Sequence, residues 1–79
     1  MNIIEQMHES EVTITKVVKL PSEESLKFTL VVEVRCLESN EVVYKKSYTD
    51  LVENLEDIFD DAERWGKNMA QKLDVEYYL

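Results

Sequence analysis

The sequence predicts an α+β fold, in which a three-stranded antiparallel β-meander carries one long C-terminal helix on one face. Two patterns predict it: apolar and polar residues alternate with period two from residue 11 to 49, and apolar residues then recur at steps of three and four. A chain of 79 residues is about half the usual domain length, so we expect a single domain. Its expected segments are an N-terminal segment at 1–10, the meander at 11–49, the helix at 50–74 and a tail at 75–79.

The N-terminal segment has a short apolar pattern. Ile3, Ile4 and Met7 have helical spacing, so this segment is expected either to form a short helix or to fray. Glu5 and His8 have the Glu-x-x-His spacing of carboxylate-bridged metal sites. Such sites need a second motif and further glutamates, and the chain contains one histidine. We therefore expect no metal site here.

The first strand is expected from Val12 to Leu20, where β-branched residues dominate, as a pleated surface prefers. One face of this strand holds Val12, Ile14, Val18 and Leu20. Lys16 is the exception on that face. Pro21 ends the strand, because proline cannot donate a hydrogen bond to the ladder.

The second strand, from Leu26 to Leu37, has the clearest alternation and is expected to be central. Its apolar face holds Leu26, Phe28, Leu30, Val32, Val34 and Cys36. On that face Cys36 is expected to be a buried, inert thiol. The next segment, 38–40, is a tight connection in which Asn40 can adopt a left-handed conformation.

The third strand is expected from Glu41 to Tyr48. A three-residue connection puts Val42, Tyr44 and Tyr48 on the apolar side, whereas a two-residue connection puts Val43 there, so both registers stay open. The outer face of this sheet holds Val17 and Val31 among polar residues. It is expected to be covered by the N-terminal segment or by a second subunit, and an edge strand could also pair between two chains.

The helix is expected to start at Asp50, which has the spacing of a capping box with Glu53. Its apolar stripe contains Leu51, Leu55, Ile58, Ala62, Trp65, Met69 and Leu73, and Phe59 widens it. Gly66 lies inside this stripe and costs about 1 kcal/mol relative to alanine. Because the apolar phase continues past Gly66, we expect one helix that approaches the sheet closely at this residue.

The net charge of −8 argues against direct binding to nucleic acid, which requires a basic surface. Residues 1–49 contain 8 acids and 6 bases, whereas residues 50–79 contain 9 acids and 3 bases, so most of the excess lies in the C-terminal part. Five acids are expected to share one exposed stripe of the helix: Glu53, Glu56, Asp57, Asp60 and Asp61. We name these five residues the acidic helix face.

Two interpretations of the acidic helix face stay open. Acids near a helix N-terminus suit the macrodipole and keep the protein in solution. Alternatively, carboxylates about 5–6 Å apart resemble the phosphates of a nucleic acid strand and would occupy a basic groove of a partner protein. Tyr77 and Tyr78, near the end of the chain, are further candidates for a partner contact.

Catalysis, cofactors and membranes are not expected. The chain has one glycine, one cysteine and one histidine. We therefore do not expect a glycine-rich phosphate-binding loop, a disulfide within the chain or a catalytic Cys-His pair. No apolar run reaches the roughly 18 residues that span a bilayer, and no secretory signal precedes the first strand. The expected location is the cytoplasm.

The expected order of helix, three strands and helix resembles that of double-stranded-RNA-binding domains. Those domains have a basic cluster at the start of the last helix, where this chain has Asp50, Glu53 and Glu56, so RNA binding is not supported. In architecture and charge the chain is also similar to some phage-encoded inhibitors of host defence, including certain anti-CRISPR proteins. We expect a non-enzymatic protein-binding module, an inhibitor from a phage or mobile element that mimics nucleic acid. The alternative is a small homodimeric accessory subunit that uses the open sheet face or an edge strand.

Overall fold

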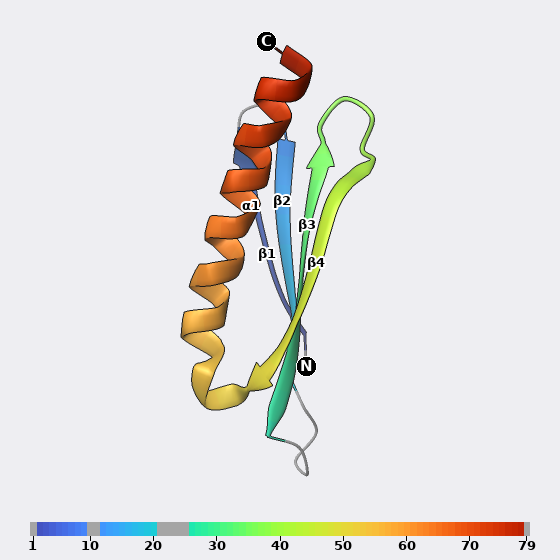
Figure 1. Cartoon of the computed structure of the whole chain (residues 1–79). Helices are drawn as coiled ribbons and strands as arrows, with labels where there is room; N and C mark the ends of the chain where they lie inside the picture. Colours follow the sequence, from blue (N-terminus) through green and yellow to red (C-terminus); the bar gives the residue numbers. More distant parts are fainter. Residues whose placement is uncertain (1, 10–11, 21–25, 79) are drawn as a thin grey trace.

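The computed structural model describes residues 2–9, 12–20 and 26–78, with side chains for 3–8, 12–20 and 26–73. Four strands form one antiparallel sheet in the order β1-β2-β3-β4 (Figure 1). The elements are β1 (Asn2–Glu9), β2 (Val12–Lys19), β3 (Lys27–Cys36), β4 (Val42–Leu51), a 3-10 turn η1 (Val52–Asn54) and the helix α1 (Leu55–Tyr78). The α+β class is confirmed, but the sheet has four strands and not three.

The fourth strand is β1, so the expectation of a short helix or a frayed end is wrong for residues 2–9 of the N-terminal segment; residues 1 and 10 lie outside the described residues. Every residue of β1 pairs with β2, from Asn2 opposite Lys19 to Glu9 opposite Val12. Ile3 and Met7 are four residues apart, a spacing that fits one face of a strand as well as one face of a helix. A helix of this length is marginal alone, whereas the edge of β2 provides hydrogen bonds along the whole segment. The segment therefore extends the sheet and does not cover its open face.

The register of β3 and β4 follows the three-residue connection. Tyr44 pairs with Val34 and Tyr48 with Leu30, so both tyrosines face the side of the even-numbered β3 residues. Asn40 has φ of 59°, which confirms the expected left-handed conformation. The register shifts between Val34 and Arg35, so Val42 pairs with Arg35 and is 41% exposed; its expected place on the apolar side is wrong. Cys36 at the end of β3 is half-buried and not fully buried as expected, because β3 ends there and the chain turns.

The core lies between α1 and the even-numbered face of β2 and β3. Its buried apolar members are Val12, Ile14, Val18, Phe28, Leu30, Val32, Val34, Ala62, Ala70 and Leu73. The helix approaches β2 closely at Gly66, where a Cβ atom would lie 2.8 Å from Cγ2 of Ile14. This confirms the expected close approach: a side chain at this position would overlap the sheet.

The helix begins later and ends later than expected. β4 continues to Leu51, which pairs with Lys27, and α1 starts only after η1. The expected capping box is therefore wrong: the Asp50 Oδ1 atom accepts hydrogen bonds from the Leu51 backbone N–H (2.7 Å) and from Asn54 Nδ2 (2.8 Å). At the other end α1 runs to Tyr78 and includes most of the expected tail. No glycine or proline after Gly66 interrupts its phase.

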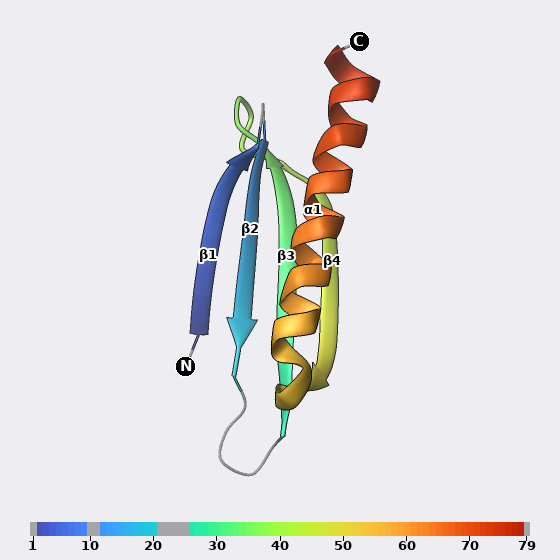
Figure 2. The ribbon, with the colours of Figure 1, turned by 90° about the vertical axis from the view of Figure 1, so that its left-hand side faces the viewer.

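The helix crosses the sheet asymmetrically. Figure 2 shows α1 in front of β3 and β4, while β1 lies to one side at the edge of the sheet. The helix side of β1 is thus less covered than that of β3. Ile3, which lies on this side, is 43% exposed. This asymmetry leaves part of the helix side of β1 open to solvent.

Candidate functional site

The acidic helix face is exposed along its length. Glu53 lies in η1, and the other four acids lie in the first two turns of α1, on the side away from the buried stripe. Asp61 Oδ1 accepts a hydrogen bond from Arg64 Nη2 at 2.6 Å. Within the described part of the chain, the remaining four have no basic partner at salt-bridge distance: Glu53, Glu56, Asp57 and Asp60. Their negative charge is therefore available to another molecule.

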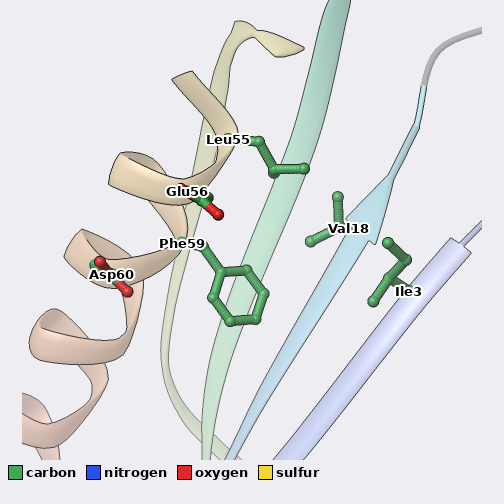
Figure 3. Close-up of a pocket in the computed structure, with 6 residues that line it drawn as sticks. All are labelled: Ile3, Val18, Leu55, Glu56, Phe59 and Asp60. Carbon is green, nitrogen blue, oxygen red and sulfur yellow. The ribbon is translucent and has the colours of Figure 1, made fainter. Parts of the chain in front are cut away.

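A groove adjoins this face. It has a volume of about 510 Å³ and lies between the first turns of α1 and the strands β1 and β2 (Figure 3). Its apolar lining consists of Ile3, Val18, Leu55 and Phe59, and two acids of the helix, Glu56 and Asp60, complete it. The groove thus combines an apolar floor with two carboxylates from the acidic helix face. The groove could not be predicted from the sequence, because Ile3 and Phe59 come to line one groove only in the folded chain.

Phe59, which lines one side of the groove, packs against the buried cation of Lys16. Lys16 has no exposed surface, and its Nζ atom lies 2.9 Å from Glu5 Oε1 and 3.2 Å from Glu63 Oε1. The same atom lies 4.1 Å from the centre of the Phe59 ring, a favourable cation–π contact. Lys16 therefore joins β1, β2 and α1 and positions Phe59. The signal in the sequence was a lysine on an otherwise apolar strand face.

The side chains of Glu5 and His8, which have the Glu-x-x-His spacing of some metal sites, do not lie on the same side of the sheet. On a strand, residues three apart point to opposite faces. Glu5 faces α1 and pairs with Lys16, whereas His8 Nδ1 lies 3.1 Å from Thr13 Oγ1 on the other face. Among the residues with described side chains, no group of three or more His, Cys, Asp or Glu residues is arranged to hold a metal ion.

The two tyrosines near the end of the chain, Tyr77 and Tyr78, belong to the last turn of α1, but their side chains lie outside the described residues. Their expected contact with a partner stays a prediction. The described helix has no stretch that is both long enough and apolar enough to cross a membrane. Comparison with protein families, with curated proteins and with solved structures finds no match for this chain.

Proposed function

We propose that this protein is a non-enzymatic binding module that uses the acidic helix face to occupy a basic site of a partner protein. The observation that carries this proposal is the row of exposed carboxylates, four of which have no basic partner within the described residues. A nucleic-acid-binding groove is the best-matched partner site, because it already accepts a row of negative charges. The expected class, an inhibitor from a phage or mobile element, would act by competing with nucleic acid for that groove.

The physical chemistry of the surface supports this proposal in two ways. Like charges three or four residues apart on a helix destabilise it by a few tenths of a kcal/mol per pair, so the row has a cost to folding that a partner would relieve. The adjoining groove offers apolar surface from which water is released on binding, and interfaces usually combine such an apolar core with a polar rim. Complementary charge then accelerates association and fixes orientation.

The test is capture of the partner from an extract of the native host, followed by titration of the captured protein. The variant Asp57→Lys with Asp61→Lys changes charge on the acidic helix face but leaves the groove intact. Its matched control is Glu38→Lys with Glu41→Lys, which makes the same charge change at exposed positions of the β3–β4 turn. We expect the first pair to weaken binding at least tenfold and the control to leave it nearly unchanged.

Salt and nucleic acid provide the second readout. Raising ionic strength from about 0.05 to about 0.5 M should weaken binding, because the Debye length falls from about 14 Å to about 4 Å and the attraction between the two charged surfaces is screened. Added duplex DNA or RNA should release the captured protein if both occupy one basic groove. Equal binding by the two charge-reversed variants, with no salt dependence, would show the proposal to be wrong. Sedimentation equilibrium of the protein alone tests the alternative, a homodimeric subunit.

A further inference from the structure

The two edges of the sheet are built differently. The β4 edge has Lys45 and Lys46 side by side at its middle, and the register of its ladder shifts opposite Val34 and Arg35. Edge lysines and irregular registers are the usual means by which proteins prevent another strand from pairing. The β4 edge is therefore protected.

The β1 edge has neither device. Its eight residues pair with β2 in an unbroken register, and the segment Asn2–Glu9 contains no lysine, arginine or proline. Ile3 is 43% and Ile4 67% exposed, on opposite faces of the strand. In the described part of the chain no element pairs with the outer edge of β1. Half of its backbone N–H and C=O groups thus point away from β2 and can accept a further strand.

This edge is continuous with the groove, because Ile3 belongs to both. A strand added beside β1 would lie about 4.8 Å further out, and every second side chain would point to the side of α1. On that side lie the apolar lining of the groove and the carboxylates of Glu56 and Asp60 (Figure 3), together with Glu5 of β1, which is paired with Lys16. Basic and apolar side chains on this face of the added strand would match them.

We propose that the β1 edge binds an extended segment of the partner, rich in lysine or arginine alternating with apolar residues, as a fifth strand of the sheet. The inference rests on the proposed function, since it specifies how the basic partner is recognised. Main-chain hydrogen bonds supply affinity in this mode of recognition, and alternate side chains supply specificity. Glu56 and Asp60 select basic residues, and the apolar groove beside Ile3 takes their aliphatic stems.

A second copy of this chain fits the edge less well. The β1 segment has an acid, Glu5, on the face that points to α1. In an antiparallel pair of β1 strands, Glu5 of the second copy would come to the side of Glu56 and Asp60, in a protein that already has a net charge of −8. Like charges brought together in this way oppose the pairing.

The experiment is selection of a displayed library of random peptides on the immobilised full-length protein. We expect the enriched peptides to show period-two alternation of apolar with basic residues. Binding of a selected peptide should slow hydrogen exchange at about half of the β1 amides, those that face away from β2. Enrichment of helical patterns, or of no basic alternating sequence, would overturn the proposal.

Matched variants locate the bound peptide. Ile4→Lys adds a charge to the β1 edge on the open face of the sheet, whereas Ser47→Lys adds the same charge on the β4 edge. We expect Ile4→Lys to weaken binding of the selected peptide at least tenfold and Ser47→Lys to have little effect on its affinity. The double variant Glu56→Gln with Asp60→Asn should weaken peptide binding about fivefold. Its matched control, Glu38→Gln with Glu41→Gln, should leave the affinity unchanged.

The outcomes separate the two proposals. Suppose that the variant Asp57→Lys with Asp61→Lys no longer captures the partner, whereas Ile4→Lys still does. This result would overturn the fifth-strand inference and leave the proposed function standing. Captured partner that is unaffected by charge reversal would instead contradict the proposed function. A dimer in sedimentation equilibrium that Ile4→Lys dissociates would show that a second copy occupies the edge, and would also overturn the inference.

Discussion

Lys16 and Glu63 form an ion pair between β2 and α1, with Nζ and Oε1 3.2 Å apart although the two residues are 47 positions apart in the chain. The lysine is completely buried, while Glu63 keeps about a third of its side chain in contact with solvent. Glu5, opposite Lys16 on β1, completes the arrangement. The single cation of Lys16 thus links the edge strand β1, its neighbour β2 and the helix. Replacing this lysine and removing its two glutamates should therefore have different effects on the free energy of unfolding.

We predict that Lys16→Met changes the unfolding free energy by less than about 1 kcal/mol, because an apolar residue of similar volume replaces the buried charge and both glutamates still reach water. Glu5→Gln with Glu63→Gln should instead destabilise the fold by about 3 kcal/mol, since it leaves a buried ammonium without a countercharge. Urea denaturation measures both. A Lys16→Met variant as unstable as the double variant would contradict this prediction.

We predict that Gly66→Ala destabilises the protein, although alanine is the better helix former by about 1 kcal/mol. Its Cβ would lie 2.8 Å from Cγ2 of Ile14, a branched methyl group in the core that cannot move aside easily. Overpacking of this kind costs about 1–3 kcal/mol, so the net change should be a loss of roughly 1 kcal/mol. Asn68→Ala, at an exposed position two residues on, should be slightly stabilising. Thermal denaturation compares the two, and a gain from Gly66→Ala would show that the helix can shift.

We predict a pH effect at the junction of β4 and η1. The hydrogen bond from Asn54 lowers the pKa of the Asp50 carboxyl below its ordinary 3.8, with further help from the Leu51 N–H and the charge of Lys27. Since the folded-state pKa is the lower one, the carboxylate stabilises the fold fully above 3.8 and loses this effect as the pH falls through the lowered value. Asn54→Ala should raise the pKa of Asp50 toward 3.8, as NMR titration would measure. The pKa should not move in Asn68→Ala, and an unchanged value in Asn54→Ala would contradict the assignment.

We predict that Asp60→Asn stabilises the protein by a few tenths of a kcal/mol at low salt. It removes the like-charge pair with Glu56, four residues before it, and asparagine has a similar helix propensity. Glu56→Gln removes the same pair but also a favourable charge in the first turn of α1, so it should gain less. Denaturant titrations at about 0.01 and 1 M salt test this, because the effect should disappear when the charges are screened. A loss of stability in Asp60→Asn at low salt would contradict it.

The central part of the fold was predictable because its signals are local. The alternation along β3, the left-handed Asn40 and the apolar stripe around Gly66 each follow from neighbouring residues. β1 was not predictable in this way, since the spacing of Ile3 and Met7 fits both a helix and a strand. The available edge of β2 decides between them, and that edge is a property of the folded sheet.

The start of the helix and the groove were missed for a related reason. Asp50 and Glu53 have the spacing of a capping box, but pairing of Leu51 with Lys27 extends β4 past that point. The five acids could be identified from helical spacing alone. Their apolar neighbour could not, because Ile3 comes from the strand that sequence reasoning did not recognise.

The position of Phe59 above Lys16 bears on how fast and how tightly a partner would bind. A ring held by a buried cation loses its rotamer freedom when the chain folds and not when the partner arrives. Such preorganisation lowers the entropic penalty of association and leaves the affinity to be set by the incoming segment. It also implies that a substitution at Lys16 could alter recognition while leaving every groove residue in place.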